Sequence, residues 1–389
     1  MIRWLSLWAW LGLAASGLAQ PAPSPLPPGM PPLPSLRAQA ETVDSLRRER
    51  LEQLVPALMR EAGVDMWILV AREYLDDPAM LPMLDSRNFT ARRRTILLFF
   101  DPGGGRPVER LTVSRYGLAG LFQPAWNPQE EPDQWARLAA LVAARDPKRI
   151  ALNVSDASPF ADGLTASQRD ALLAALPEPW RGRVVPAGQL AIDWLSIRTP
   201  AEATLYAQVM RTAHAIIAEG LSPAAITPGR TTAADLQWWY RERLAGLGLA
   251  PWFHPSVALF RQGVAGELAG DTVIEPGDLV WTDFGLVLMG LATDSQTLAY
   301  VLRPGETAAP EGLVAGLAAA ITVKEKRPDL EVLVVEKATS GWAGKADRSH
   351  VGLHVFLILF TNLILLPVLL SYTHLRNLDR KREYRLRQL

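Results

Sequence analysis

The chain has 389 residues, more than one hydrophobic core usually serves, so two domains are expected. Lys and Arg together number 40, as do Asp and Glu, and this balance argues against nucleic acid or an anionic membrane surface as the dominant partner. The absence of Cys excludes disulfides, thiolate catalysis and Cys-based zinc sites. A metal site would have to use Asp, Glu and the five histidines.

The N-terminus has the pattern of an export signal. Arg3 is followed by an apolar, uncharged stretch that ends in small residues near Ala19, which predicts a signal peptide over 1–19. A retained N-terminal anchor is the alternative. Eight prolines fall between residues 21 and 34, and we interpret 20–42 as a semi-rigid, extended linker.

Helical and strand patterns alternate over 43–196 and predict an α/β domain. A helical pattern starts at Val43, and the apolar run DMWILV follows it as a buried strand. The segment 93–113 predicts two strands joined by a turn at Gly103–Gly105, because no Gly-Lys-Ser/Thr follows to make a phosphate loop. Further on, a helix over 166–176 is predicted to be capped by Thr165.

A second unit of α+β type is predicted to begin at residue 197. Pro200 suits the first turn of a helix, and Glu202 favours the N-terminus of that helix. A second helix is predicted with Thr231 as its cap, and strand-like segments follow it.

The most informative segment of the chain is VWTDFGLVLMGLATDSQT, which predicts a β-hairpin turning near Leu288, Met289 and Gly290. Such pairing would place Asp283 opposite Asp294 on one face. Opposed like charges destabilise a hairpin unless a cation lies between them, and paired carboxylates suit one or two divalent ions. Two exposed aspartates without a ligand are the alternative.

Two segments carry a family resemblance. IDWLSIRTPAEATLYAQVMRTAH resembles the domain junction of Xaa-Pro aminopeptidases, prolidases and creatinases. GDLVWTDFGLVLMGLATDSQTLAYVLRPGE, which includes the turn Pro276-Gly277-Asp278, is similar to the first metal-ligand block of these pita-bread metallopeptidases. The resemblance implies that Asp283 binds one metal and that Asp294 bridges two. It also implies that a metal-activated water hydrolyses the peptide bond after an N-terminal residue.

The remaining ligands of that family are only partly represented. ADRSHVGLHV resembles its His block, which makes His350 the candidate third ligand, although an incidental His is an equal alternative. Gly266 stands where the resemblance would place a substrate-contacting His. The family's two Glu ligands have no counterpart before the C-terminal segment, so 197–350 is interpreted as a partial metallopeptidase domain.

The C-terminal segment predicts a membrane anchor. Residues 351–372 contain no Asp, Glu, Lys or Arg and are long enough for a hydrocarbon core of ~30 Å. The tail 373–389 has six Lys or Arg against two acids, which predicts a cytoplasmic location for the tail. A buried soluble helix is one alternative. A second is that residues 351–389 do not belong to the native product.

We therefore expect an exported, membrane-anchored metallo-aminopeptidase with its main domains outside the cytoplasm. Its expected cofactor is a divalent metal, as two ions of Mn, Co, Zn or Fe. Its expected partners are a peptide substrate and a second copy of the chain, with no nucleic acid. The competing hypothesis is a catalytically inactive, membrane-tethered remnant or peptide-binding module that lacks the two Glu ligands.

Overall fold

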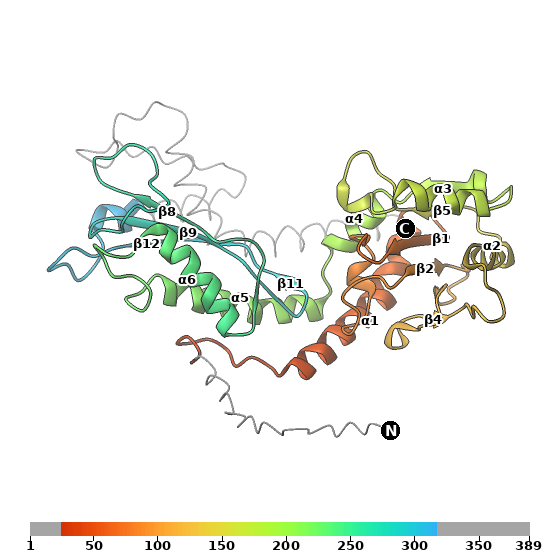
Figure 1. Cartoon of the computed structure of the whole chain (residues 1–389), viewed down its shortest axis with the longest axis horizontal. Coiled ribbons are helices and arrows are strands. Elements are labelled where there is room, and N and C mark those ends of the chain that lie inside the picture. The colour runs from red at the N-terminus through yellow and green to blue at the C-terminus, as the bar shows by residue number, and fades with distance from the viewer. Residues whose placement is uncertain (1–24, 317–389) are drawn as a thin grey trace, which may run out of the picture.

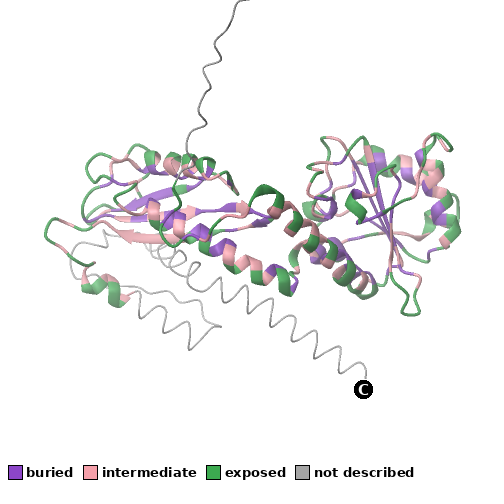
Figure 2. Ribbon diagram, turned by 90° about the horizontal axis from the view of Figure 1, so that it is seen from below, coloured by how far each residue is buried: buried purple, intermediate pink, exposed green. Residues whose placement is uncertain are grey.

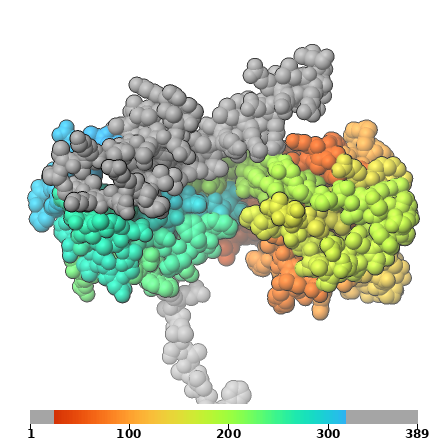
Figure 3. Space-filling model, turned by 90° about the horizontal axis from the view of Figure 1, so that it is seen from above, coloured from red at the N-terminus to blue at the C-terminus, as the bar shows by residue number. Residues whose placement is uncertain are grey.

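The computed structural model describes residues 25–316, which form two lobes of α/β architecture. Helices and strands from the first half of the described chain make one lobe, and those that follow make the other (Figure 1). The two lobes are also distinguished by colour in the space-filling view (Figure 3). Each lobe also has hydrophobic cores of its own.

The first lobe is built on a six-stranded mixed sheet in the order β4-β3-β2-β1-β5-β6. β1 pairs antiparallel with β2 and parallel with β5, so it lies in the middle of the sheet. The bounds are β1 (Met66–Arg72), β2 (Arg94–Phe100), β3 (Glu109–Thr112), β4 (Gln123–Pro124), β5 (Ile150–Leu152) and β6 (Val184–Pro186). This arrangement confirms the predicted buried strand and the predicted hairpin around Gly103–Gly105, whose three glycines all have positive φ.

Helices cover both faces of this sheet. They are α1 (Leu36–Glu61), α2 (Gln134–Arg145), α3 (Ala166–Ala175) and α4 (Gln189–Ser196), with short 3-10 turns η1 (Leu81–Met83), η2 (Leu118–Gly120), η3 (Pro159–Ala161) and η4 (Arg181–Arg183). Successive residues of β1 point to opposite faces, as strand geometry requires. Trp67 and Leu69 pack with α1 and α4, whereas Met66 and Ile68 pack with α2 and α3. The apolar run in β1 is therefore explained by burial on both sides (Figure 2).

The second lobe packs two helices on antiparallel strands. Its elements are α5 (Pro200–Gly220), α6 (Ala233–Gly246), β7 (Ala250–Pro251), β8 (Ser256–Phe260), β9 (Leu279–Phe284), β10 (Leu286–Leu288), β11 (Leu291–Ala292) and β12 (Ser295–Tyr300). The strands form two small sheets, β12-β9-β8 and β11-β10-β7. Residues of both helices and of β8 to β11 share one core, so the helices cover one face of these strands.

The helix starts depend on side-chain caps. Thr199 and Glu202 form a reciprocal capping box with Pro200 at the first turn, which confirms the predicted start of α5. The predicted cap Thr231 is wrong by one residue, because Thr232 caps α6 together with Asp235. Thr165 does precede α3, but its hydroxyl makes no cap hydrogen bond.

The first helix begins seven residues before the predicted Val43, at Leu36, behind the N-cap Ser35. The proline-rich segment ahead of it lies against the second lobe. Met30 is buried there, Leu33 and Val43 pack on the same core, and Arg243 Nη2 donates to the Pro25 carbonyl at 2.5 Å. This part of the predicted linker is thus held in place by the fold.

The predicted signal peptide 1–19, membrane span 351–372 and tail 373–389 lie outside the described residues. Within 25–316, no helix combines the length and the apolar character that crossing a membrane requires.

Candidate functional site

The two aspartates singled out in the sequence lie on one β-hairpin. β9 and β10 lead into a two-residue turn at Met289 and Gly290, whose φ angles of 52° and 78° are the positive values that a tight hairpin turn needs. β11 and β12 return alongside them. The hairpin and the position of its turn are therefore confirmed.

The register of the hairpin corrects one prediction. The turn pairs Leu288 with Leu291, and counting back along both strands brings Gln296, not Asp294, opposite Asp283. Asp294 is one diagonal step away on the same face, where side chains still reach one another. The paired carboxylates are retained, with an amide group beside them. Sequence reasoning missed Gln296, because the pattern did not fix how many residues the turn contains.

The alternation of β9 explains how Asp283 is presented. Val280, Thr282 and Phe284 are buried toward the helices, whereas Trp281 and Asp283 lie on the other face and are half-buried. Gly285 follows because no side chain fits there: a Cβ atom would come within 2.4 Å of the Thr293 carbonyl oxygen. The return strand can therefore approach closely at the level of the carboxylates.

The two carboxylates of Asp283 and Asp294 repel each other, and this repulsion contributes to a raised pKa at Asp283. Burial, the charge of Asp294 and a hydrogen bond with Asp294 raise the pKa of Asp283 to about 6, while a hydrogen bond from Gln296 opposes the rise. A cation between the two carboxylates would remove the repulsion that contributes to this shift.

On this face of β9, the buried polar atoms without a partner in the part of the chain that the structure describes are Asp283 Oδ1 and Trp281 Nε1. Buried polar atoms are ordinarily hydrogen-bonded or coordinated. An unsatisfied carboxylate oxygen beside a second carboxylate fits a hard divalent ion, for which oxygen is the preferred donor.

Neighbouring side chains hold the hairpin in place. Arg261 binds Asp278 through two hydrogen bonds of 2.8 Å, Nε to Oδ1 and Nη2 to Oδ2, and so joins the end of β8 to the turn before β9. Tyr206 on α5 donates its hydroxyl to the Ala292 carbonyl at 3.1 Å. Asp278 is thus a structural acid rather than a candidate ligand.

The donor set within residues 25–316 stops at two carboxylates, since no group of three or more His, Asp or Glu side chains gathers there. The predicted third ligand, His350, lies outside the described residues. His254 is engaged elsewhere: its ring is 5.3 Å from that of Trp238, and its Nδ1 lies 3.3 Å from Arg241 Nη1.

The sequence matches no protein-family model and no curated protein. Solved structures similar to it include an Xaa-Pro dipeptidase from Bacillus anthracis, at 19% identity over 72% of this chain and 70% of that one, with a TM-score of 0.45. An X-Pro aminopeptidase from Thermotoga maritima is 17% identical over 69% and 70%, with a TM-score of 0.47. Zinc-substituted aminopeptidase P from Escherichia coli is 9% identical over 74% and 68%, with a TM-score of 0.49.

Proposed function

We propose that this protein is a metal-dependent aminopeptidase of the Xaa-Pro type, with Asp283 and Asp294 among its metal ligands. The observation that carries the proposal is the convergence of these two carboxylates on one face of a hairpin, with Asp283 Oδ1 buried and unpartnered among the described residues. The motif resemblance of the hairpin and of the domain junction supports the peptidase assignment.

In this proposal, the side chains around the hairpin would hold the metal ions and orient the ligands. The carboxylates supply oxygen donors, Gln296 steadies Asp283 through a hydrogen bond, and Gly285 lets the return strand approach closely beside them. His350 is the proposed third ligand. A bound pair of divalent ions, of Mn, Co, Zn or Fe, would supply an activated water for attack on a peptide carbonyl.

A second candidate function has its own support. The described chain brings only two ligands together, fewer than hard divalent ions ordinarily take. This favours an inactive remnant or a peptide-binding module that keeps the hairpin without turnover. In either case we propose that the lobes are exported, that residues 351–372 anchor them to a membrane, and that a peptide is the ligand. A homodimer is part of the same proposal.

Calorimetric titration of the full-length protein with Mn²⁺ tests the metal site. We expect binding by the wild-type chain and loss of at least about tenfold in affinity in Asp294→Asn, since one charged oxygen donor is removed. The exposed Asp271→Asn, which lowers the charge by the same amount on the same lobe, is the matched control.

Hydrolysis of Xaa-Pro peptides then separates the two candidates. Metal-dependent release of the N-terminal residue, abolished in Asp294→Asn, supports the enzyme. Metal binding without hydrolysis assigns the inactive module, and an unchanged Mn²⁺ affinity in Asp294→Asn refutes the site itself.

A further inference from the structure

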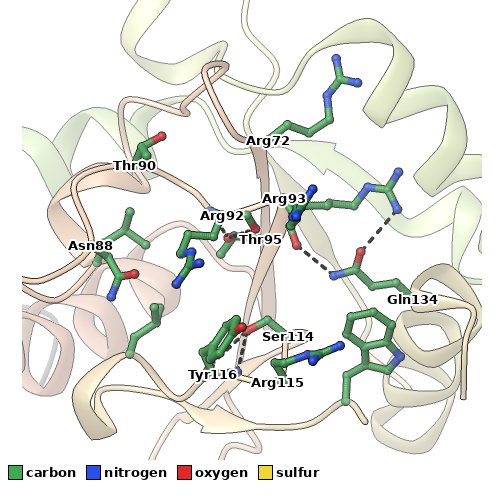
Figure 4. Close-up of a pocket in the computed structure, with 14 residues that line it drawn as sticks. Arg72, Asn88, Thr90, Arg92, Arg93, Thr95, Ser114, Arg115, Tyr116 and Gln134 are labelled. Carbon is green, nitrogen blue, oxygen red and sulfur yellow. Dashed lines mark hydrogen bonds between the residues drawn. The ribbon is translucent and has the colours of Figure 1, made fainter. Parts of the chain in front are cut away.

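The first lobe contains a cavity of about 580 Å³ whose lining is strongly basic. It lies where β1 ends and β2 begins, beside the loops before β2 and after β3 (Figure 4). Its volume is in the range of sites for small organic ligands. Five arginines line it, namely Arg72, Arg92, Arg93, Arg94 and Arg115, and its lining includes no Asp or Glu.

These arginines are not paired with carboxylates in the described chain, although the charge of Asp133 acts on Arg94 at longer range. Elsewhere in the described chain, Arg50, Arg145 and Arg243 each contact a carboxylate at 2.6 or 2.7 Å. Within residues 25–316, none of the five cavity arginines forms an ion pair. The cavity therefore concentrates positive charge in a protein whose overall formal charge is zero.

The strand register forces two of these charges together. Arg72 and Arg94 are directly paired across β1 and β2, an arrangement that is unfavourable for like charges. Burial, with Arg72 as a second cause, lowers the pKa of the Arg94 guanidinium. Arg72 Nε is buried and has no hydrogen-bond partner in the described chain. An anion beside Arg94 would reduce the repulsion between the two guanidinium groups.

Arg94 is fixed by neutral groups, which leaves its charge available. Its Nε donates to Gln168 at 2.7 Å, and its guanidinium lies 4.5 Å from the ring centre of Trp135. Gln134 contacts it from the α2 side and donates to the Val113 carbonyl, so this wall of the cavity is rigid. Arg92, Arg93 and Arg115 are the more exposed arginines of the lining.

Arg92 lies over an exposed aromatic ring, that of Tyr116. Its guanidinium carbon is 5.5 Å from the ring centre of Tyr116, and Figure 4 shows the two side chains on the same side of the cavity. Arg93 and Leu118 both have positive φ, at 57° and 48°, which is uncommon for residues other than Gly. Such strained backbone is found preferentially at ligand sites.

We propose that this cavity binds a small phosphate-bearing anion, held by the guanidinium groups of Arg92 and Arg115 beside the fixed charge of Arg94. Guanidinium forks match phosphoryl oxygens through paired hydrogen bonds, and a phosphoryl group brings nearly two negative charges. The site is separate from the carboxylate pair, which lies in the other lobe.

Calorimetric titration of the full-length protein with tripolyphosphate tests the proposal. EDTA is present throughout, so that no metal complex at the carboxylate pair contributes. We expect one site per chain and a higher unfolding temperature for the first lobe, because the anion binds only the folded state. The double variant Arg92→Gln/Arg115→Gln should lose about tenfold or more in affinity, since two charge-assisted contacts are removed.

Arg106→Gln on the exposed turn between β2 and β3 is the control, and it should bind as the wild type does. The variant Arg92→Lys/Arg115→Lys should retain part of the affinity, because charge remains while the fork is lost. An equal loss in Arg106→Gln, equally tight binding of citrate, or preferential binding of an oligonucleotide would each overturn the assignment.

Discussion

The carboxyl pKa is raised to about 6 at both Asp77 and Asp283. Burial is the main cause at both residues, but the other groups that act on each carboxyl differ. At Asp283, burial is reinforced by the negative charge of Asp294. At Asp77, burial acts against hydrogen bonds from Asn153 and from the backbone amides of Ala79 and Met80. The first arrangement suits a cation, whereas the second fastens η1 to the centre of the first lobe.

The stability of the first lobe should depend on pH through Asp77. Its folded pKa is above the unfolded value, so the folded state holds the proton more tightly between about pH 4 and 6. The free energy of unfolding should therefore fall by about 2 to 3 kcal/mol as pH rises through that range. Asp77→Asn should remove this part of the slope, as measured by urea unfolding across the range.

Asp170→Asn is the control for that measurement, because Asp170 is exposed on α3 of the same lobe. Its pH slope should equal that of the wild type. If Asp77→Asn also keeps the wild-type slope, burial of the Asp77 carboxyl is not what links folding to pH.

Single residues also show the limits of the sequence. The aspartate pair could be found from spacing alone, since a hairpin with a central Gly places both side chains on one face. The diagonal offset followed from the turn containing two residues, a detail that pattern alone left open. Arg261 could not be assigned to Asp278, because contacts between side chains on different elements leave no periodic signal.

Among the elements, α1, α4 and α5 are joined by one buried ion pair. Arg50 on α1 contacts Glu202 on α5 at 2.7 Å and the carbonyl of Ile197 at 2.7 Å. It also donates to the Trp194 carbonyl and stacks on that indole ring. Because Glu202 simultaneously accepts from the Thr199 amide, a single carboxylate both starts α5 and attaches it to the first lobe.

Glu202→Ala should destabilise the protein by about 3 to 5 kcal/mol, since it leaves Arg50 buried without its partner and removes a helix cap. Guanidinium-induced unfolding measures the loss. Glu41→Ala, which breaks the exposed pair between Arg37 and Glu41, should change stability little. Equal effects of the two substitutions would show that burial of the pair is unimportant.

The presence of helices and strands was predicted better than the residues at which they begin. The helices and strands of the described chain follow hydrophobic periodicity, which sequence reveals directly. The start of α1 was missed because Leu36 to Thr42 lacks an apolar face of its own and follows prolines. The cap of α6 was missed by one position because Thr231 and Thr232 are chemically equivalent, and only the backbone geometry selects between them.

On the scale of the whole molecule, the proline-rich segment leads into α1 of the first lobe and packs on the core of the second. Its composition did not predict this packing. Its residues were expected to form an extended spacer, but Met30 is 7% exposed and belongs to the core of the second lobe. Proline-rich sequences have no helical or strand period, so their docking partners cannot be predicted from pattern. A division near residue 197, by contrast, was predicted from chain length and from the change of pattern there.

Met30→Ala should weaken the second lobe selectively, by about 2 to 5 kcal/mol for a buried Met side chain. Hydrogen exchange followed by mass spectrometry should show lost protection in α5 and α6 with β1 unchanged. Met83→Ala, which removes a buried Met from the first lobe, should give the reverse pattern. Uniform loss across both lobes would mean that Met30 does not act through the second core.

The hydrogen bond from Arg243 to the carbonyl of Pro25 spans 218 positions of sequence. During synthesis, the first lobe can therefore fold before Arg243 and the rest of α6 have emerged from the ribosome. Until then, the segment around Pro25 has no surface to bind. Contacts of such long range form late, because closing the intervening loop is entropically unfavourable. The beginning of the described chain is thus among the last parts to be secured, and its docking marks the completion of the second lobe.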